Sequence, residues 1–167
     1  MTKTTANRRQ SLSNSGRHIY DRYLNFSLGA EEFAIPLLDV REVIAMPEIT
    51  PVPFSPSHFL GIMNLRGQII SIIDLRAKLG IKANNGSETA VIICHIANVS
   101  LGIVVDAINQ VIAPSPDELS EKPEMQTTKK SDYIAKIYRA KSQLIMLIDV
   151  AKALGVEDLL AASKAAA

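Results

Sequence analysis

The amino-acid sequence predicts a mainly β fold made of two small barrels with short helices, and an internal repeat is the main reason. The segment Gln68–Leu75 aligns without a gap with Gln143–Val150, and Leu79-Gly80 then falls on Leu154-Gly155. In both places an apolar strand ends in an aspartate before a helical pattern. Two similar β-rich halves of about 70 residues are typical of paired barrels.

The spacing of the repeat also predicts where the halves differ. Val43 and Val111 are 68 residues apart, whereas Asp74 and Asp149 are 75 apart, so extra residues must enter between these pairs. The polar loop at 118–130 is the simplest place for them. A core of this size rarely supplies more than about 3–5 kcal/mol of stability. The halves are therefore expected to share an apolar interface, with a groove along their junction.

The first half contains strand patterns interrupted by turn residues. Pro36 is expected to open a helical pattern, and Ser55-Pro56 has the form of an N-cap followed by proline at the first helical position. Gly80 should end the last helical turn. In chain order, the expected elements are strands at 20–28 and 33–35, a helical pattern at 37–43, a strand at 44–49, a helical turn at 56–60, a hairpin at 61–73 and a helical turn at 75–79.

The hairpin at 61–73 has its turn at Asn64 to Gly67. Gly67 is the expected turn residue, because glycine adopts positive φ without steric cost. Arg66 cannot follow the apolar arms inward, because an unpaired buried charge costs several kcal/mol. It must reach water, an acid or a partner. An intramolecular salt bridge and a contact with another protein both remain open.

The second half restarts after Asn84–Ser87, which has the composition of a linker. Its expected elements are strands at 89–96, 101–105 and 107–112, a hairpin at 133–139 and 143–148, and a helical pattern at 150–154. The hairpin turn Arg139–Ser142 has no glycine, which leaves its turn type open. Lys141 occupies the position that corresponds to Arg66.

The expected organisation is a disordered basic tail at 1–19, a folded region at 20–154, and a helix or frayed tail at 155–167. Within the folded region, one barrel is expected at about 20–82 and the other at about 83–154. The chain is 47% hydrophobic and 21% charged, which is typical of a soluble globular protein. No apolar signal core or membrane span is evident, so a cytoplasmic location is expected.

The sequence shows no catalytic or metal-binding constellation. His18, His58 and His95 have no cysteine, histidine or acid nearby at a metal-ligand spacing, so neither a metal nor a cofactor is predicted. Asp74 and Asp149 occupy equivalent positions of the repeat, each before a helical pattern. Helix N-caps explain this periodicity better than an acid pair does. A binding protein is therefore expected, not an enzyme.

Five stretches, in this order and spacing, carry a family resemblance: 28–35, 40–44, 61–67, 74–76 and 101–106. They include Asn64-Leu65-Arg66-Gly67 and Asp74-Leu75-Arg76. The chain resembles the bacterial chemotaxis coupling protein family, CheW, over about 20–154. The resemblance implies two SH3-like five-stranded barrels related by a pseudo-two-fold, which agrees with the repeat.

The same resemblance implies a non-enzymatic adaptor. It would connect the cytoplasmic tips of methyl-accepting chemotaxis receptors to the regulatory domain of the histidine kinase CheA, in arrays at the membrane. By position, the family's receptor-facing groove falls on Val40, Glu42, Val43, Arg66 and Val111. No residues are assigned to the kinase interface. No phosphotransfer, ATP-binding or receiver motif is present, which favours a stand-alone coupler.

Two other functions remain as alternatives. A barrel mouth could bind a small molecule, and a ligand-dependent shift in melting temperature would reveal it. A nucleic-acid-binding barrel could use the basic tail, with affinity that falls steeply with salt. Few exposed aromatic residues are expected for base stacking, so nucleic-acid binding is not expected. Asn64 and Arg66 interrupt the longest apolar run, so direct membrane insertion is not expected either.

Overall fold

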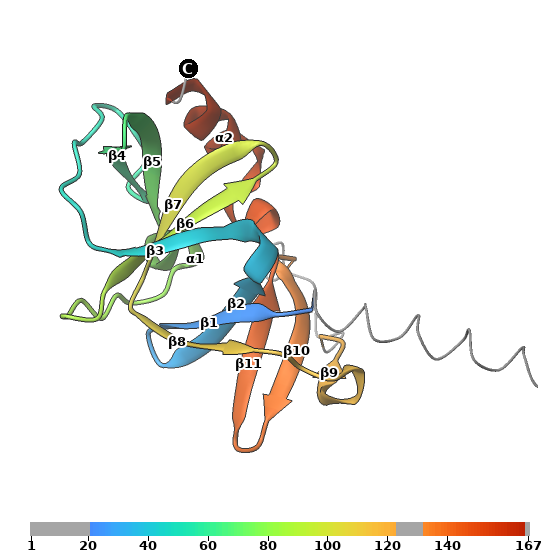
Figure 1. Ribbon diagram of the computed structural model, residues 1–167. Coiled ribbons are helices and arrows are strands. Elements are labelled where there is room, and N and C mark those ends of the chain that lie inside the picture. The colour runs from blue at the N-terminus through green and yellow to red at the C-terminus, as the bar shows by residue number, and fades with distance from the viewer. Residues whose placement is uncertain (1–20, 123–131, 166–167) are drawn as a thin grey trace, which may run out of the picture.

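The computed structural model describes residues 21–122 and 132–165, whose strands form two sheets (Figure 1). Barrel A has the strand order β8-β1-β2-β11-β10-β9, with β1 Tyr23–Leu28, β2 Glu31–Pro36, β8 Ala107–Ile112, β9 Leu119–Ser120, β10 Ile134–Ala140 and β11 Gln143–Ile148. Barrel B has the order β3-β6-β7-β5-β4, with β3 Val40–Ala45, β4 Phe59–Leu65, β5 Gln68–Asp74, β6 Ala90–Ile96 and β7 Val99–Val105.

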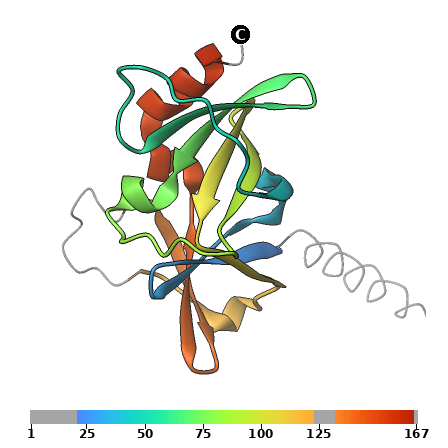
Figure 2. The same cartoon turned by 90° about the vertical axis from the view of Figure 1, so that its left-hand side faces the viewer.

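Short helices accompany the two barrels. They are α1 at Leu75–Leu79, α2 at Val150–Ala165, and the 3-10 turns η1 at Leu37–Asp39 and η2 at Pro116–Glu118. Figure 2 shows the barrels one above the other, with α1 and α2 on the same side. The two helices contact each other, and both pack against β5 and β7 of barrel B.

The two barrels have the same strand order, as the repeat predicts. The order β3-β6-β7-β5-β4 corresponds position by position to β8-β1-β2-β11-β10, and β9 is a short addition at the edge of barrel A. In each barrel one pair of strands is parallel, β5 with β7 and β2 with β11. The prediction of two SH3-like barrels related by a pseudo-two-fold is therefore confirmed.

The expected division of the barrels at residue 82 is wrong. The hairpin β1–β2 of the first half belongs to barrel A, whose other strands come from the second half. The hairpin β6–β7 of the second half lies between β3 and β5 of the first half. The physical reason is that β6 and β7 are buried almost throughout and need strand partners on both sides. The halves thus exchange hairpins.

One apolar core is shared by both barrels. The stacked rings of Phe26 and Phe33, with centroids 6.3 Å apart, lie in it. Other members, drawn from both sheets, are Leu24, Leu28, Ile35, Ile73, Ile92, Leu101, Ile103, Val105 and Ile148. Two smaller apolar clusters belong to the individual barrels. The shared core explains why the exchanged hairpins stay in place.

Two helical expectations in the first half are wrong. Of the pattern at 37–43, only Leu37–Asp39 forms a 3-10 turn, and the chain then continues as β3. Pairing with β6 outweighs the helical spacing, and Val40, Val43 and Ile44 are β-branched. At 56–60, the Phe59 amide donates to the Pro56 carbonyl at 3.0 Å, and β4 begins at once.

The termini bear on two further expectations. The tail at 1–19 and most of the loop at 118–130 lie outside the described residues. The described part of 155–167 is helical, because α2 continues to Ala165 beyond a kink at Gly155. Within 21–122 and 132–165, no helix is long and apolar enough to cross a membrane.

Candidate functional site

The β4–β5 hairpin displays Arg66 at its tip. Arg66 and Gly67 have φ values of 51° and 85°, and a type I′ turn requires positive φ at both central residues. The Asn64 side-chain oxygen accepts a hydrogen bond from the Gly67 amide at 2.8 Å. A Cβ at Gly67 would meet nothing within 4 Å, so the turn needs glycine for its backbone angle and not for space. The turn fixes where the Arg66 side chain begins.

Arg66 is paired with Glu42 while remaining largely exposed. Its two terminal nitrogens donate to the two Glu42 carboxylate oxygens at 2.6 and 3.0 Å, and the exposed side-chain fractions are 73% and 29%. The hydrogen bond from Arg66 holds the pKa of Glu42 below its ordinary value. Because β3 and β4 are at opposite ends of the strand order, this pair joins the two edges of barrel B.

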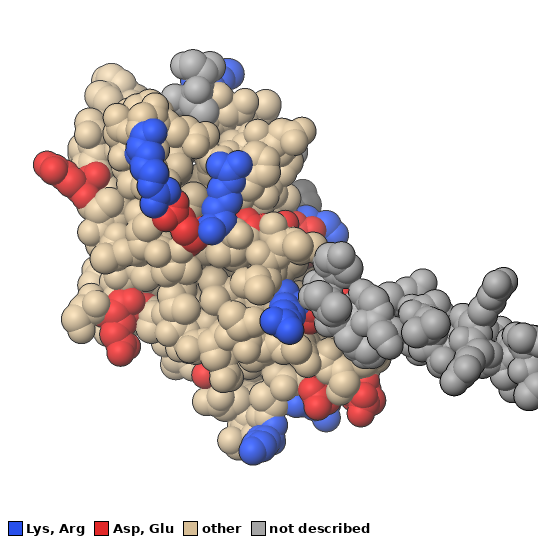
Figure 3. Space-filling view, viewed as in Figure 1, with Lys and Arg blue, Asp and Glu red and all other residues tan. Residues whose placement is uncertain are grey.

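The three valines of the expected groove lie on two strands. Val40 and Val43 are on β3, where Val40 packs against the shared core and Val43 is 41% exposed. Val111 is 49% exposed on β8, the edge strand of barrel A, opposite Leu24. Figure 3 shows acidic and basic side chains together over β3 and a largely uncharged surface from there toward β8. The structure thus joins Glu42 to Arg66, places Val40 and Val43 on the same strand as Glu42, and places Val111 on barrel A.

Asp74 and Asp149 both accept hydrogen bonds from helix N-termini. One Asp74 oxygen accepts from the amides of Arg76 and Ala77 at 3.0 and 3.4 Å. Asp149 accepts from the Lys152 amide at 3.2 Å. These are the contacts of N-cap residues.

The second hairpin turn, between β10 and β11, differs from the first. Its residue Lys141 has a φ of 43°, whereas Ser142 does not have positive φ. Positive φ at the first central residue alone is the sign pattern of a type II′ turn. The turn without glycine therefore differs from the first in the backbone conformation of its second central residue.

A buried charged network, which the sequence analysis missed, joins the two barrels. Arg76 is 4% exposed and donates to Asp74 at 2.9 Å, Asp106 at 2.8 Å and Asn85 at 2.7 Å. The second oxygen of Asp106 accepts from the Gly29 amide in the β1–β2 turn. Burial raises the pKa of Asp106, but the hydrogen bonds from Arg76 and two backbone amides outweigh it, so the pKa is lowered overall. Arg76 and Asp106 lie in the stretches 74–76 and 101–106, which carry the family resemblance, and this was the signal in the sequence that could have pointed to the network.

A second cluster that the sequence analysis missed surrounds Asp158 on α2. This carboxylate lies 2.8 Å from His58 Nε2 and 2.9 Å from Lys78 Nζ. Asp158 is 5% exposed. Its partners are 100 and 80 residues away in sequence, so no local pattern could have paired them.

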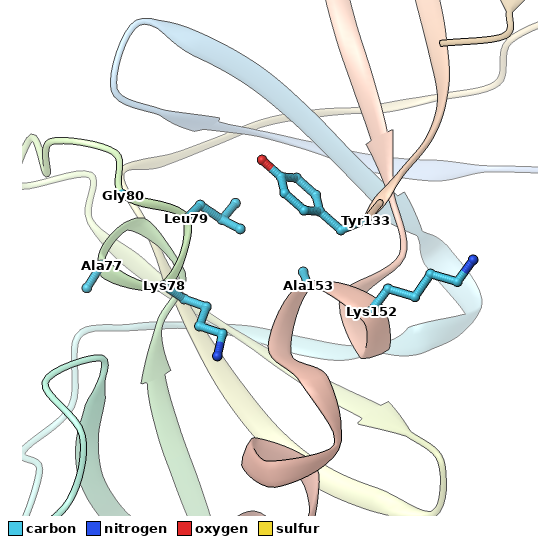
Figure 4. Close-up of a pocket in the computed structure, with 7 residues that line it drawn as sticks. All are labelled: Ala77, Lys78, Leu79, Gly80, Tyr133, Lys152 and Ala153. Atoms are coloured by element: carbon cyan, nitrogen blue, oxygen red, sulfur yellow. The ribbon is translucent and has the colours of Figure 1, made fainter. Parts of the chain in front are cut away.

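A cavity of about 320 Å³ lies between α1, Tyr133 and the start of α2 (Figure 4). Tyr133 points across it toward Leu79, while the ammonium groups of Lys78 and Lys152 point away from each other. Elsewhere, burial raises the pKa of the Cys94 thiol to about 12, which keeps it protonated. Neither feature supplies an activated nucleophile with a base beside it.

Comparison with known proteins agrees with this architecture. Residues 22–158 match the family model described as the CheW-like domain. Chemotaxis protein CheW of Klebsiella aerogenes is 30% identical over 146 residues, covering 87% of this chain and 88% of the relative. Chemotaxis protein CheW of Treponema pallidum is 28% identical over 141 residues, covering 81% and 83%.

A solved structure shares the fold. The scaffolding protein TtCheW from Thermoanaerobacter tengcongensis matches with a TM-score of 0.75 and 29% identity, covering 83% of this chain and 94% of that one. The family model spans most of the chain and includes every strand of both barrels. The chain therefore belongs to the CheW family of chemotaxis proteins.

Proposed function

We propose that this protein is a non-enzymatic adaptor that couples the cytoplasmic tips of methyl-accepting chemotaxis receptors to the regulatory domain of the histidine kinase CheA. Membership of the CheW family supports a chemotaxis scaffold. It does not favour the alternatives of a small-molecule or nucleic-acid-binding barrel. The adaptor would act in the cytoplasm, where receptor arrays at the membrane recruit it.

The observation that best supports the proposed receptor site is that Arg66 is exposed at the hairpin tip and paired with Glu42. The Arg66 side chain is 73% exposed, yet the hairpin turn fixes where it begins and Glu42 accepts two hydrogen bonds from its guanidinium. Two of its five N–H donors face Glu42, and the others remain for a carboxylate or for carbonyl oxygens at a helix end. A side chain oriented before binding loses less conformational entropy when a partner arrives.

The valines would complete the receptor site around this charged centre. Val43 and Val111 provide exposed apolar surface beside the uncharged region between β3 and β8 (Figure 3). Val40 lies on the same strand as Glu42 and packs against the shared core. An arginine with apolar neighbours has the composition expected of an interface hot spot. The kinase would bind a separate surface, and many weak contacts in an array would raise the apparent affinity.

The test compares Arg66→Ala with Lys141→Ala. Both residues occupy the first central position of a two-residue hairpin turn and have positive φ, so each substitution places an alanine at a position of positive φ. Truncation of a hot-spot side chain costs about 2–4 kcal/mol, so Arg66→Ala should weaken receptor binding by roughly 30- to 1000-fold. Lys141→Ala should leave it unchanged. Receptor affinity, CheA affinity and melting temperature are measured on the same samples.

The result separates the binding role of Arg66 from a purely structural one. If Arg66 acts in binding, CheA affinity and melting temperature stay near those of the wild type while receptor affinity falls. If it only closes barrel B through Glu42, the melting temperature falls and receptor affinity follows the folded fraction. An intact fold with undiminished receptor affinity would remove Arg66 from the site.

A further inference from the structure

The C-terminal helix consists of two segments with different relations to the repeat. Its first turn, Val150–Leu154, corresponds to α1, and Gly155 corresponds to Gly80. After Gly80 the chain leaves the helix, whereas after Gly155 it continues as a second helical segment, 157–165, here called the C-terminal arm. Gly155 has φ 83° and ψ 168°, a region that is essentially restricted to glycine. The arm is thus an addition to the repeat, joined through a glycine.

Few apolar side chains hold the arm on the barrel. Ala162 is 1% exposed and Leu159 is partly buried against the shared core, but Leu160 is 55% exposed. An isolated helix of this length is unstable in water, because nucleation is costly and few hydrogen bonds follow it. The arm therefore depends on its contacts with the rest of the protein.

The buried carboxylate of Asp158 adds polar contacts to these apolar ones. It accepts from His58 Nε2 at 2.8 Å and forms an ion pair with Lys78 Nζ at 2.9 Å. An ionised carboxylate can only accept, so Nε2 must carry the hydrogen. The carbonyl of His58 in turn accepts from the Asp74 amide at 2.7 Å. Asp158 therefore connects the arm to α1 and to the base of the β4–β5 hairpin.

We propose that the C-terminal arm is a strap that opens from barrel B and closes onto it, with Asp158 as its catch. Segments with few buried apolar contacts open at lower free energy than core strands do. The contacts of Asp158 with His58 and Lys78 compensate for the small number of apolar contacts, and both break when the arm moves away from barrel B. Opening swings the arm about Gly155, uncovers the part of the shared core under Ala162, and frees the Lys78 ammonium beside the cavity in Figure 4.

Hydrogen exchange of the full chain tests the strap. In the wild type, amides at 157–165 should exchange measurably faster than those of β6 and β7, with little dependence on low urea concentrations, because local opening exposes little surface. Asp158→Asn should accelerate exchange of the arm on the order of 10- to 100-fold, since it removes the charge that pairs with Lys78 and leaves an uncharged acceptor for His58. Exchange in β6 and β7 should not change.

Two sets of variants separate the catch from general effects. Glu157→Gln removes the adjacent exposed carboxylate and should leave exchange of the arm unchanged. His58→Ala should accelerate it, whereas His58→Gln, which keeps an N–H donor, should restore most of the protection. Wild-type arm amides that exchange only with the core strands, or Asp158→Asn with wild-type protection, would overturn the proposal. So would an arm that has no protection in the wild type.

Discussion

Arg66 and Arg76 both pair with carboxylates but differ in how far they are exposed to solvent. The Arg66 side chain is 73% exposed and Arg76 is 5% exposed, although each forms hydrogen bonds to a carboxylate. Exposed ion pairs contribute little to stability because water screens them, whereas loss of one member of a buried pair leaves an uncompensated charge. The exposure of Arg66 is therefore consistent with its proposed role in recognition, and the burial of Arg76 predicts a role in the stability of the fold.

Arg76→Met should lower the free energy of unfolding by about 3 kcal/mol or more, because Asp106 would remain buried without its cation. Urea denaturation measures the change, and Arg41→Met, at an exposed position of β3, is the control. Adding Asp106→Asn to Arg76→Met should recover part of the loss, because it removes the stranded charge. A double variant that loses the sum of the two single effects would contradict this account.

The same network predicts a dependence of stability on pH. The folded pKa of Asp106 lies below its ordinary value of 3.8, so the folded protein binds fewer protons than the unfolded chain in that range. The stabilisation is therefore present above 3.8 and is lost as the pH falls through the lower folded pKa. Urea denaturation at a series of acidic pH values should show a shallower loss of stability for Asp106→Asn than for the wild type. Parallel pH profiles would show that Asp106 is not responsible.

At the scale of elements, a close backbone contact restricts which residue can occupy position 61 in the β4–β5 hairpin. Gly61 on β4 has a φ of 144°, and a Cβ there would lie 2.1 Å from the Thr50 carbonyl oxygen. Thr50 is held at this place by two backbone hydrogen bonds with Ile62, each 2.9 Å long. The segment that contains Thr50 therefore packs directly against the backbone of β4.

Gly61→Ala should destabilise the protein by about 3 kcal/mol or more, because both the backbone angle and the contact with Thr50 oppose a side chain. Gly86→Ala is the control, since a Cβ at Gly86 meets nothing within 4 Å. Thermal unfolding of the two variants gives the comparison. Equal melting temperatures would mean that the segment at Thr50 moves away at little cost.

The elements also show how far local sequence patterns reach. Runs of β-branched and apolar residues predicted the strands, and turn residues such as Gly67 and Gly80 predicted where elements end. The pattern at 37–43 misled because β3 is an edge strand that alternates between partly buried and exposed residues. Its strand conformation comes from pairing with β6, more than 40 residues later, and not from its own spacing.

At the scale of the whole molecule, the repeat predicted two barrels but not which strands build each one. A hairpin that pairs within its own half and one exchanged with the other half have the same local sequence. The pairings between strands of different halves decide between them: β2 with β11, β5 with β7, β1 with β8 and β3 with β6. For the same reason the sequence left Arg66 open between a salt bridge and a partner contact. Its meeting with Glu42 depends on the closure of barrel B.

The exchanged hairpins predict that the two halves cannot fold separately. Cutting the chain after residue 82 gives one fragment with β1 to β5 and another with β6 to β11. Each fragment then lacks the strands that complete its barrels, and the shared core is divided between them. Neither fragment alone should show cooperative unfolding or protected amides, because the apolar faces of its strands stay uncovered.

An equimolar mixture of the two fragments should restore both, since all strand partners are then present. Circular dichroism during thermal unfolding, with hydrogen exchange on the same samples, distinguishes the cases. Barrels built from continuous halves would instead give two fragments that fold alone and gain nothing on mixing. Cooperative unfolding of either isolated fragment would therefore rule out the exchange as a requirement for folding. Recovery only in the mixture would show that the unit of folding is the pair of barrels.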